Sequence, residues 1–183
     1  GKFDYVMANP PFNVADFWVS RVTRNDDGSY SICNVVGADE YANGVDDNAF
    51  TNGAAIRALE YACEAARICN EPVPEIWEEV GRGIRILRFK DGVTREHATY
   101  NGEMIKQADV NLLGYPLYFV GDAESQKKDM EYYVDKIDPQ NGPAMSYSVF
   151  CVQYARMGDA KRAYEMFCRC YQPGMVISSF SSP

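Results

Sequence analysis

The chain has 183 residues, of which 46% are hydrophobic and 24% are charged, a balance that excludes general disorder and predicts a globular fold. Its 26 acidic and 18 basic residues give a formal net charge of −8, so the sequence has no basic surplus for a phosphate backbone and we expect no nucleic-acid partner. Apolar runs fall short of the ~20 residues of a membrane span, so we expect no membrane partner. Residues 1–13 lack a signal-peptide pattern and an initiator Met, which weakly favours the cytoplasm and indicates a piece of a longer protein.

The six cysteines do not follow the spacing of a zinc site or a redox motif. The closest pair is Cys168-x-Cys170, and four of the six fall in helical patterns among apolar neighbours. A free cysteine in such a place packs as a small hydrophobic residue. The sequence therefore predicts reduced cysteines and no metal site.

The first structured region indicated by the sequence is a β-hairpin. Residues 17–22 and 29–36 are rich in β-branched and aromatic side chains, and an Asp-Asp-Gly turn at 26–28 separates them. A polar loop over residues 37–44 follows.

The rest of the chain alternates between helical patterns and short loops. Apolar spacing predicts a long helix over 46–68, with Asp46 or Asp47 as its cap, and shorter helices over the ranges 75–82, 123–137, 143–157 and 159–171. Residues 91–102 are polar and predict a long loop, and the tail from 174 to 183 shows no period. The fold class predicted is mainly α, with one N-terminal β-hairpin.

Three sequence blocks, in order along the chain, carry a resemblance to a known family. They are Gly37-Ala38-Asp39-Glu40-Tyr41 with Val45-Asp46-Asp47-Asn48-Ala49-Phe50-Thr51-Asn52, then Lys106-Gln107-Ala108-Asp109-Val110, then Gly142-Pro143-Ala144-Met145-Ser146. Over about residues 15–173 the chain resembles glycoside hydrolase family 65, which contains acid trehalase-like hydrolases and disaccharide phosphorylases acting on α-glucosides. The resemblance implies a partial α/α-barrel built from helical hairpins, of the six-hairpin glycosidase type.

The resemblance also implies a mechanism and its residues. Cleavage with inversion needs a carboxylic acid that protonates the leaving oxygen, and Glu40 takes this role by its place in the motif. Lys106 and Gln107 would hydrogen-bond the hydroxyl groups of an α-linked glucoside or disaccharide, while Asp39 and Tyr41 would shape the loop. The resemblance leaves hydrolysis and phosphorolysis open. No cofactor is implied except inorganic phosphate as a co-substrate of a phosphorylase, and the catalytic base would lie outside this chain.

Each of these residues also has a simpler interpretation. An Asp-Glu pair before a helix is usually a solvated surface or a cap, and Lys106 by itself would be a surface lysine. The only histidine, His97, lies in a polar stretch and is best interpreted as a surface or loop residue. The family loop often has proline and histidine where this chain has Ala38 and Ala42, so substrate preference does not transfer. The alternative function is a truncated, non-catalytic helical module, and exposed barrel faces would favour self-association in either case.

A second motif at the N-terminus conflicts with the first. Residues 3–13 (Phe-Asp-Tyr-Val-Met-Ala-Asn-Pro-Pro-Phe-Asn) resemble the Asn-Pro-Pro-Phe motif of adenine-N6 DNA methyltransferases, in which the asparagine holds the amino group of a flipped adenine. The segment could be a coincidence, the scar of a fused reading frame or, least favoured, a methyltransferase fragment. The resulting organisation is a foreign or fused segment over 1–13, a partial glycosidase domain over 14–173 and an irregular tail over 174–183.

Overall fold

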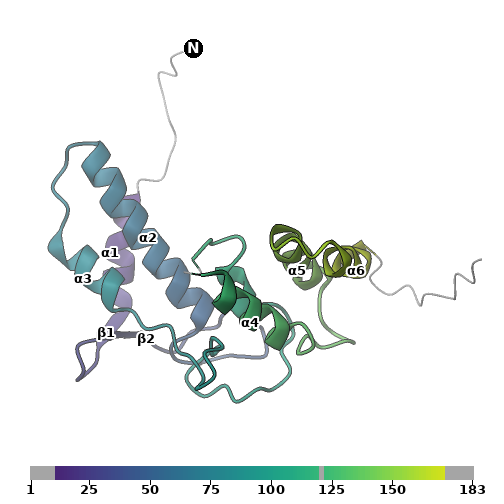
Figure 1. The fold of residues 1–183 in the computed structure, drawn as a ribbon. Coiled ribbons are helices and arrows are strands. Elements are labelled where there is room, and N and C mark those ends of the chain that lie inside the picture. Colours follow the sequence, from purple (N-terminus) through teal and green to yellow (C-terminus); the bar gives the residue numbers. More distant parts are fainter. Residues whose placement is uncertain (1–10, 120–121, 172–183) are drawn as a thin grey trace, which may run out of the picture.

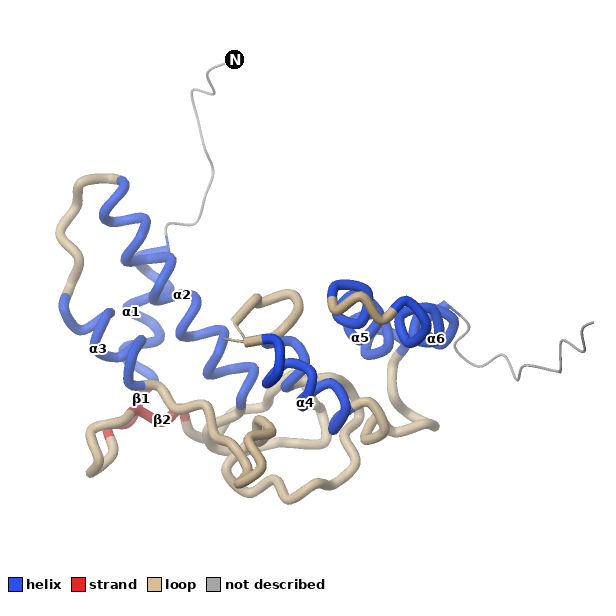
Figure 2. The backbone as a smooth tube through the Cα atoms, in the orientation of Figure 1, coloured by secondary structure: helices blue, strands red, loops and turns tan. Residues whose placement is uncertain are grey.

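The computed structural model describes residues 11–119 and 122–171, with side chains described from residue 14 onward. In chain order the elements are α1 (Pro11–Arg21), β1 (Val22–Arg24), β2 (Tyr30–Ile32), α2 (Ala49–Ile68), α3 (Glu75–Gly83), the 3₁₀ helix η1 (Val110–Leu113), α4 (Ala123–Tyr133), α5 (Ala144–Arg156) and α6 (Ala160–Tyr171). Helices and long loops dominate the described chain, and the two short strands form its one sheet (Figures 1 and 2). The predicted class, mainly α with one hairpin, is confirmed.

The hairpin is shorter than predicted, and its first predicted strand is wrong. β1 and β2 pair antiparallel, with Val22 opposite Ile32, whereas residues 17–21 form the end of α1. The helix prevails because Ala15, Trp18 and Val19 recur at helical spacing and pack into one cluster with residues of α2 and α3. The second strand stops before residue 36, since the backbone turns into the left-handed region at Asn34 (φ 54°).

α2 is the longest helix of the described chain and leads directly away from the predicted catalytic loop. It begins at Ala49, three residues later than predicted, and its cap is Asn48, whose side chain accepts a hydrogen bond from the backbone N–H of Thr51 (2.9 Å). The predicted caps are wrong because Asp47 has a positive φ and pairs with Arg85, while Asp46 accepts from the Asn34 backbone.

One glycine inside α2 has a packing reason. A Cβ at Gly53 would overlap the side chain of Leu113 in η1, so the glycine lets the helix and η1 approach closely. The long helix is thereby set against the segment that follows the Lys106 block.

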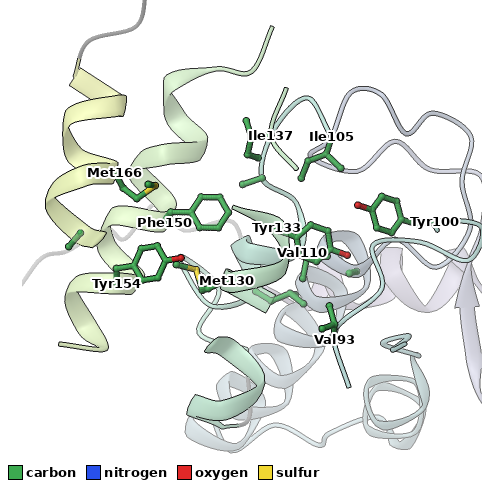
Figure 3. Packing of buried hydrophobic residues seen from close by; sticks show 14 residues of the cluster. Val93, Tyr100, Ile105, Val110, Met130, Tyr133, Ile137, Phe150, Tyr154 and Met166 are labelled. Atoms are coloured by element: carbon green, nitrogen blue, oxygen red, sulfur yellow. The ribbon is translucent and has the colours of Figure 1, made fainter. Parts of the chain in front are cut away.

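The described apolar core consists of two clusters. The first joins α1, α2, α3 and the hairpin, which lie together at one end of the molecule in Figure 1. The second joins the loop before η1 to α4, α5 and α6, with Met130, Tyr133 and Phe150 fully buried at its centre (Figure 3). α5 and α6 are connected by the short turn 157–159 and pack against each other as a helical hairpin.

α4 ends at Tyr133 rather than at the predicted residue 137. Ile137 instead forms a parallel bridge with Ile105, with hydrogen bonds from Ile105 N–H to Lys136 C=O (2.9 Å) and from Asp138 N–H to Ile105 C=O (2.8 Å). Ile105 and Ile137 lie side by side in Figure 3. This bridge fixes the residue immediately before Lys106.

The predicted loop over 91–102 is confirmed as a loop, but part of it is buried. Val93, Thr94, Glu96 and Tyr100 are all buried. α4 anchors the loop, because Asp129 accepts from Thr94 N–H (2.7 Å) and the Tyr133 hydroxyl donates to Thr94 C=O (2.8 Å).

The cysteines, the lengths of the helices and the exposed face of α6 bear on three expectations from the sequence. All six cysteines lie in the described ranges and are unpaired there, and only Cys63 is buried, so the expected reduced state stays a prediction. None of the helices in residues 11–119 and 122–171 is long and apolar enough to span a membrane. α6 exposes Tyr164, Phe167 and Tyr171; self-association through such a face stays a prediction.

Candidate functional site

Glu40 lies at the tip of a loop that a single bridge closes. Val35 and Val45 exchange two backbone hydrogen bonds (2.9 and 3.0 Å) at the neck of the loop, between β2 and α2. Within it, the backbone N–H of Ala42 donates to Asp39 C=O (3.2 Å), so Glu40 occupies the first central position of a tight turn. Its side chain is 60% exposed. The carboxylate is therefore held out toward solvent by a constrained backbone.

The three predicted site residues come together in the structure. The Lys106 ammonium contacts Glu40 Oε2 at 2.5 Å, although 66 residues separate them. The side-chain amide of Gln107 donates to the backbone C=O of Ala38 in the same loop. Hydrogen bonding to Glu40, followed by its negative charge, raises the pKa of Lys106. An acid, a cation and an amide thus share one small surface.

Asp39 links the Glu40 loop to the segment that contains Lys106 and Gln107. Its side chain is buried, and its Oδ1 accepts hydrogen bonds from the backbone N–H groups of Lys106 (2.7 Å), Gln107 (3.4 Å) and Tyr41 (3.3 Å). One carboxylate oxygen therefore fixes the backbone on both sides of the Glu40–Lys106 contact, which agrees with the loop-shaping role expected for Asp39.

Asp109 provides a second buried anchor. Its Oδ2 accepts from the N–H groups of Ala38 (2.7 Å) and Asp39 (3.3 Å) and from the Asn48 side chain (3.0 Å), and its Oδ1 accepts from Phe50 N–H (3.3 Å). Burial raises the pKa of Asp109, and these four donors oppose that shift. In the structure Asp109 links the start of the loop to the first turn of α2.

Close packing against Asp109 explains why residue 37 is a glycine. A Cβ at this position would overlap Nδ2 of Asn48 and Oδ2 of Asp109, both of which are buried. We expect Gly37→Ala to lower the free energy of unfolding by about 1–3 kcal/mol in a chemical denaturation experiment, because the buried pair must move apart.

The matched control for this substitution is Gly81→Ala in α3. A Cβ there meets Leu59 at an ordinary contact distance of 3.4 Å, and alanine favours a helix. Equal stability changes in the two variants would contradict the packing argument at Gly37.

The third sequence block also contacts the second. The buried hydroxyl of Ser146 accepts a hydrogen bond from the backbone N–H of Ala108 (2.9 Å). The Tyr41 hydroxyl reaches the neighbouring turn, where it donates to Asp138 Oδ2 (2.6 Å), and this bond lowers the pKa of Asp138. The third block therefore packs against the second, and the second contacts the Glu40 loop.

The sequence interpretation missed Glu96. This glutamate is fully buried behind Asp39, although it comes from a stretch that looks polar and solvated. Neither of its side-chain oxygens has a hydrogen-bond partner among the described residues. Burial, then the charges of Asp109 and Asp39, raise the pKa of Glu96 to about 9. No pattern in the sequence distinguishes it from an exposed loop glutamate.

A pocket of about 270 Å³ opens beside the loop, next to Glu96. Its wall includes Asp39, Tyr41, His97, Tyr100 and Glu103. His97 lies in the loop as predicted, and burial lowers its pKa. No group of three or more His, Cys, Asp or Glu side chains in the described parts of the chain is arranged to hold a metal ion.

Comparison with known proteins assigns the chain to a family. Residues 11–90 match the model of the glycosyl hydrolase family 65 central catalytic domain. A kojibiose hydrolase from Mucilaginibacter mallensis is 47% identical over 161 residues, which cover 88% of this chain and 24% of the relative. The chain belongs to glycoside hydrolase family 65. The resemblance deduced from the three blocks is thereby confirmed.

More distant family 65 proteins match a similar length. A protein-glucosylgalactosylhydroxylysine glucosidase from Danio rerio is 37% identical over 166 residues, covering 88% of this chain and 25% of the relative. The chain spans about a quarter of the length of these curated relatives.

A solved structure shows the same fold. A protein from the human microbiome, described as a kojibiose phosphorylase, superimposes with a TM-score of 0.69 at 19% identity, over 86% of this chain and 26% of that one. The fold of this chain is thus that of a part of a family 65 α/α-barrel, as predicted.

The N-terminal motif is only partly accessible to this comparison. Residues 1–10, including the Asn-Pro-Pro triplet up to Pro10, lie outside the described residues. The family match begins at residue 11, and α1 runs from Pro11 through the predicted boundary at 13–14. That boundary, and the one at residue 173, stay predictions.

Proposed function

We propose that this chain supplies the general acid and part of the sugar-binding surface of an enzyme that cleaves α-glucosidic bonds with inversion. Glu40 is the acid, and Lys106 and Gln107 bind sugar hydroxyl groups. The observation that carries the proposal is the 2.5 Å contact between Lys106 and the exposed Glu40 carboxyl, which unites two family motifs. The reaction is hydrolysis, or phosphorolysis with inorganic phosphate as co-substrate.

The geometry supports a division of labour between exposed and buried groups. A general acid must reach the leaving oxygen of a bound substrate, and the Glu40 side chain is accessible for this. The side chain of Asp39 accepts from the backbone N–H of Tyr41, the residue after Glu40, and from that of Lys106. Positioning of this kind lowers the entropic cost of bringing acid and sugar together.

Lys106 can exchange partners when a sugar binds. Its ammonium has three N–H donors, of which the contact with Glu40 engages one. The others can bind hydroxyl groups while the carboxyl moves toward the scissile oxygen. The names of the relatives, a kojibiose hydrolase and a glucosylgalactosylhydroxylysine glucosidase, support a glucosyl unit as the group bound here.

The proposal is tested by transplanting this segment into a complete relative. The aligned 161 residues of the M. mallensis kojibiose hydrolase are replaced by those of this chain, and release of glucose from kojibiose is measured. Activity is the expected result. A folded transplant without activity would instead support the non-catalytic alternative.

Lys106→Ala in this transplant probes the sugar-binding surface. We expect kcat/KM to fall about 10- to 100-fold, since a charged hydrogen-bond donor to the substrate is lost. Lys127→Ala is the matched control, because Lys127 is an exposed lysine of α4 paired only loosely with Glu131 (3.9 Å). Equal activity in the two variants would contradict a role for Lys106 in binding.

A further inference from the structure

Three buried carboxyl groups lie beneath the Glu40 loop, and one of them has no visible partner. Asp39, Glu96 and Asp109 are 2%, 0% and 0% exposed and come from three separate segments. Asp39 and Asp109 each accept several N–H donors, whereas both oxygens of Glu96 lack a partner among the described residues. A buried carboxylate without a hydrogen bond or a cation is strongly unfavourable.

The groups that face Glu96 are themselves acidic. They are Asp39 from the catalytic loop, Asp109 from the segment before η1 and Glu103 from its own loop, with the phenols of Tyr100 and of Tyr133 in α4 nearby. Two carboxyl groups can form a hydrogen bond to each other only if one carries a proton. Asp109 is the less suitable carrier, because its four donors favour the charged form.

We propose that Glu96 keeps its proton at neutral pH and donates it in a hydrogen bond to the Asp39 carboxylate, acting as a positioning residue for the Glu40 loop. This bond occupies the Asp39 oxygen that the backbone amides leave free. Oδ1 then stays directed at the N–H groups of Tyr41 and Lys106, on either side of the acid. The effect on catalysis rests on the proposed function, but the protonation and the hydrogen bond do not.

Burial and charge agree with this assignment. Removal from water is the largest influence on Glu96, and the negative charges of Asp109 and Asp39 act in the same direction, so its pKa rises to about 9. Because the pKa of Glu96 is higher in the folded state than in the unfolded state, the folded protein is most stable at low pH. Its free energy of unfolding then falls as the pH rises from the unfolded-state pKa toward the folded-state pKa.

The first test is the infrared spectrum of the 183-residue chain near neutral pH. A protonated carboxylic acid has a C=O band that carboxylates lack, and we expect this band in the wild type and in Glu103→Gln but not in Glu96→Gln. Glu103 is the matched control because its carboxylate accepts from Asn101 N–H (2.7 Å) and its pKa is lowered. A wild-type spectrum without the band, or a band that persists in Glu96→Gln, would overturn the proposal.

The second test uses pH as the variable. Between about pH 5 and 9, the unfolding equilibrium constant of the wild type should rise about tenfold per pH unit relative to that of Glu96→Gln, whose amide is always neutral. In NMR spectra of the wild type, the backbone amide of Lys106 should titrate near pH 9, because it donates to Asp39, the proposed partner of Glu96.

Glu96→Gln should keep the Glu40 loop in place, since the glutamine side chain can donate to Asp39. Glu96→Leu cannot, so it should change the chemical shifts of the Tyr41 and Lys106 backbone amides at every pH. If Glu96→Gln does not fold, the wild-type infrared band and the Lys106 titration still decide. Parallel unfolding curves for wild type and Glu96→Gln, or a Lys106 amide that does not titrate, would overturn the proposal. Because these readouts do not measure turnover, their failure is separate from a failure of the transplant.

Discussion

Replacing Glu40 by glutamine in the transplanted enzyme is expected to lower kcat for kojibiose about 10²- to 10⁴-fold. Glutamine has nearly the same shape and can still contact Lys106, but it cannot deliver a proton to the leaving oxygen. The loop should keep its structure, because its anchors are Asp39 and Asp109 rather than Glu40. The measurement is glucose release under saturating substrate, together with a thermal unfolding curve.

A change of leaving group separates an acid from a residue that merely binds. Fluoride departs from α-glucosyl fluoride with little need for protonation by an acid. The fall in kcat caused by Glu40→Gln should therefore be much smaller on this substrate than on kojibiose. Glu71→Gln is the matched control, because Glu71 is an exposed loop glutamate away from the three motif blocks. A Glu40→Gln defect of the same size on both substrates would contradict the role as acid.

The components of the site could be predicted from sequence because short motifs specify them. Glu40, Lys106 and Gln107 lie in blocks 66 residues apart in the sequence, and in the structure Lys106 contacts Glu40 while Gln107 contacts Ala38 of the same loop. Their roles stay predictions. The blocks could not show how this contact arises: backbone N–H groups converge on one oxygen of Asp39, and that depends on tertiary packing.

Glu96 could not be predicted for the opposite reason. Its surroundings in the sequence, Arg95 and His97, are polar, and a loop of this composition is normally solvated. Burial comes from distant contacts, since α4 anchors the loop through Asp129 and Tyr133. A buried acid produced in this way leaves no local signal.

The fold shows the same division between local and distant causes. Apolar spacing was sufficient to predict the helices α2 to α6, apart from their ends and the cap of α2. It failed at residues 17–21, where aromatic and β-branched residues favour a strand locally but pack as a helix against α2 and α3. The end of α4 was misplaced because Ile137 pairs with Ile105, a partner that no local pattern indicates.

Asp109 is the position where a single substitution should destabilise the described fold most. We expect Asp109→Ala to lower the free energy of unfolding by about 3–5 kcal/mol, because four N–H donors lose their acceptor inside the protein. For a chain of this length that corresponds to a fall in Tm of about 10 °C. The measurement is chemical denaturation followed by circular dichroism, with the exposed Asp26→Ala as control.

The variant Asp109→Asn tests which of the two Asp109 oxygens contributes more to the free energy of unfolding. Its one carbonyl oxygen can serve the three donors grouped at Oδ2, but its amide nitrogen then faces the Phe50 N–H, which is also a donor. The loss should therefore fall between those of wild type and Asp109→Ala, with the change concentrated at the first turn of α2. If Asp109→Ala proved as stable as Asp26→Ala, the loop would have to be held by other contacts. Asp39 alone would then position Glu40.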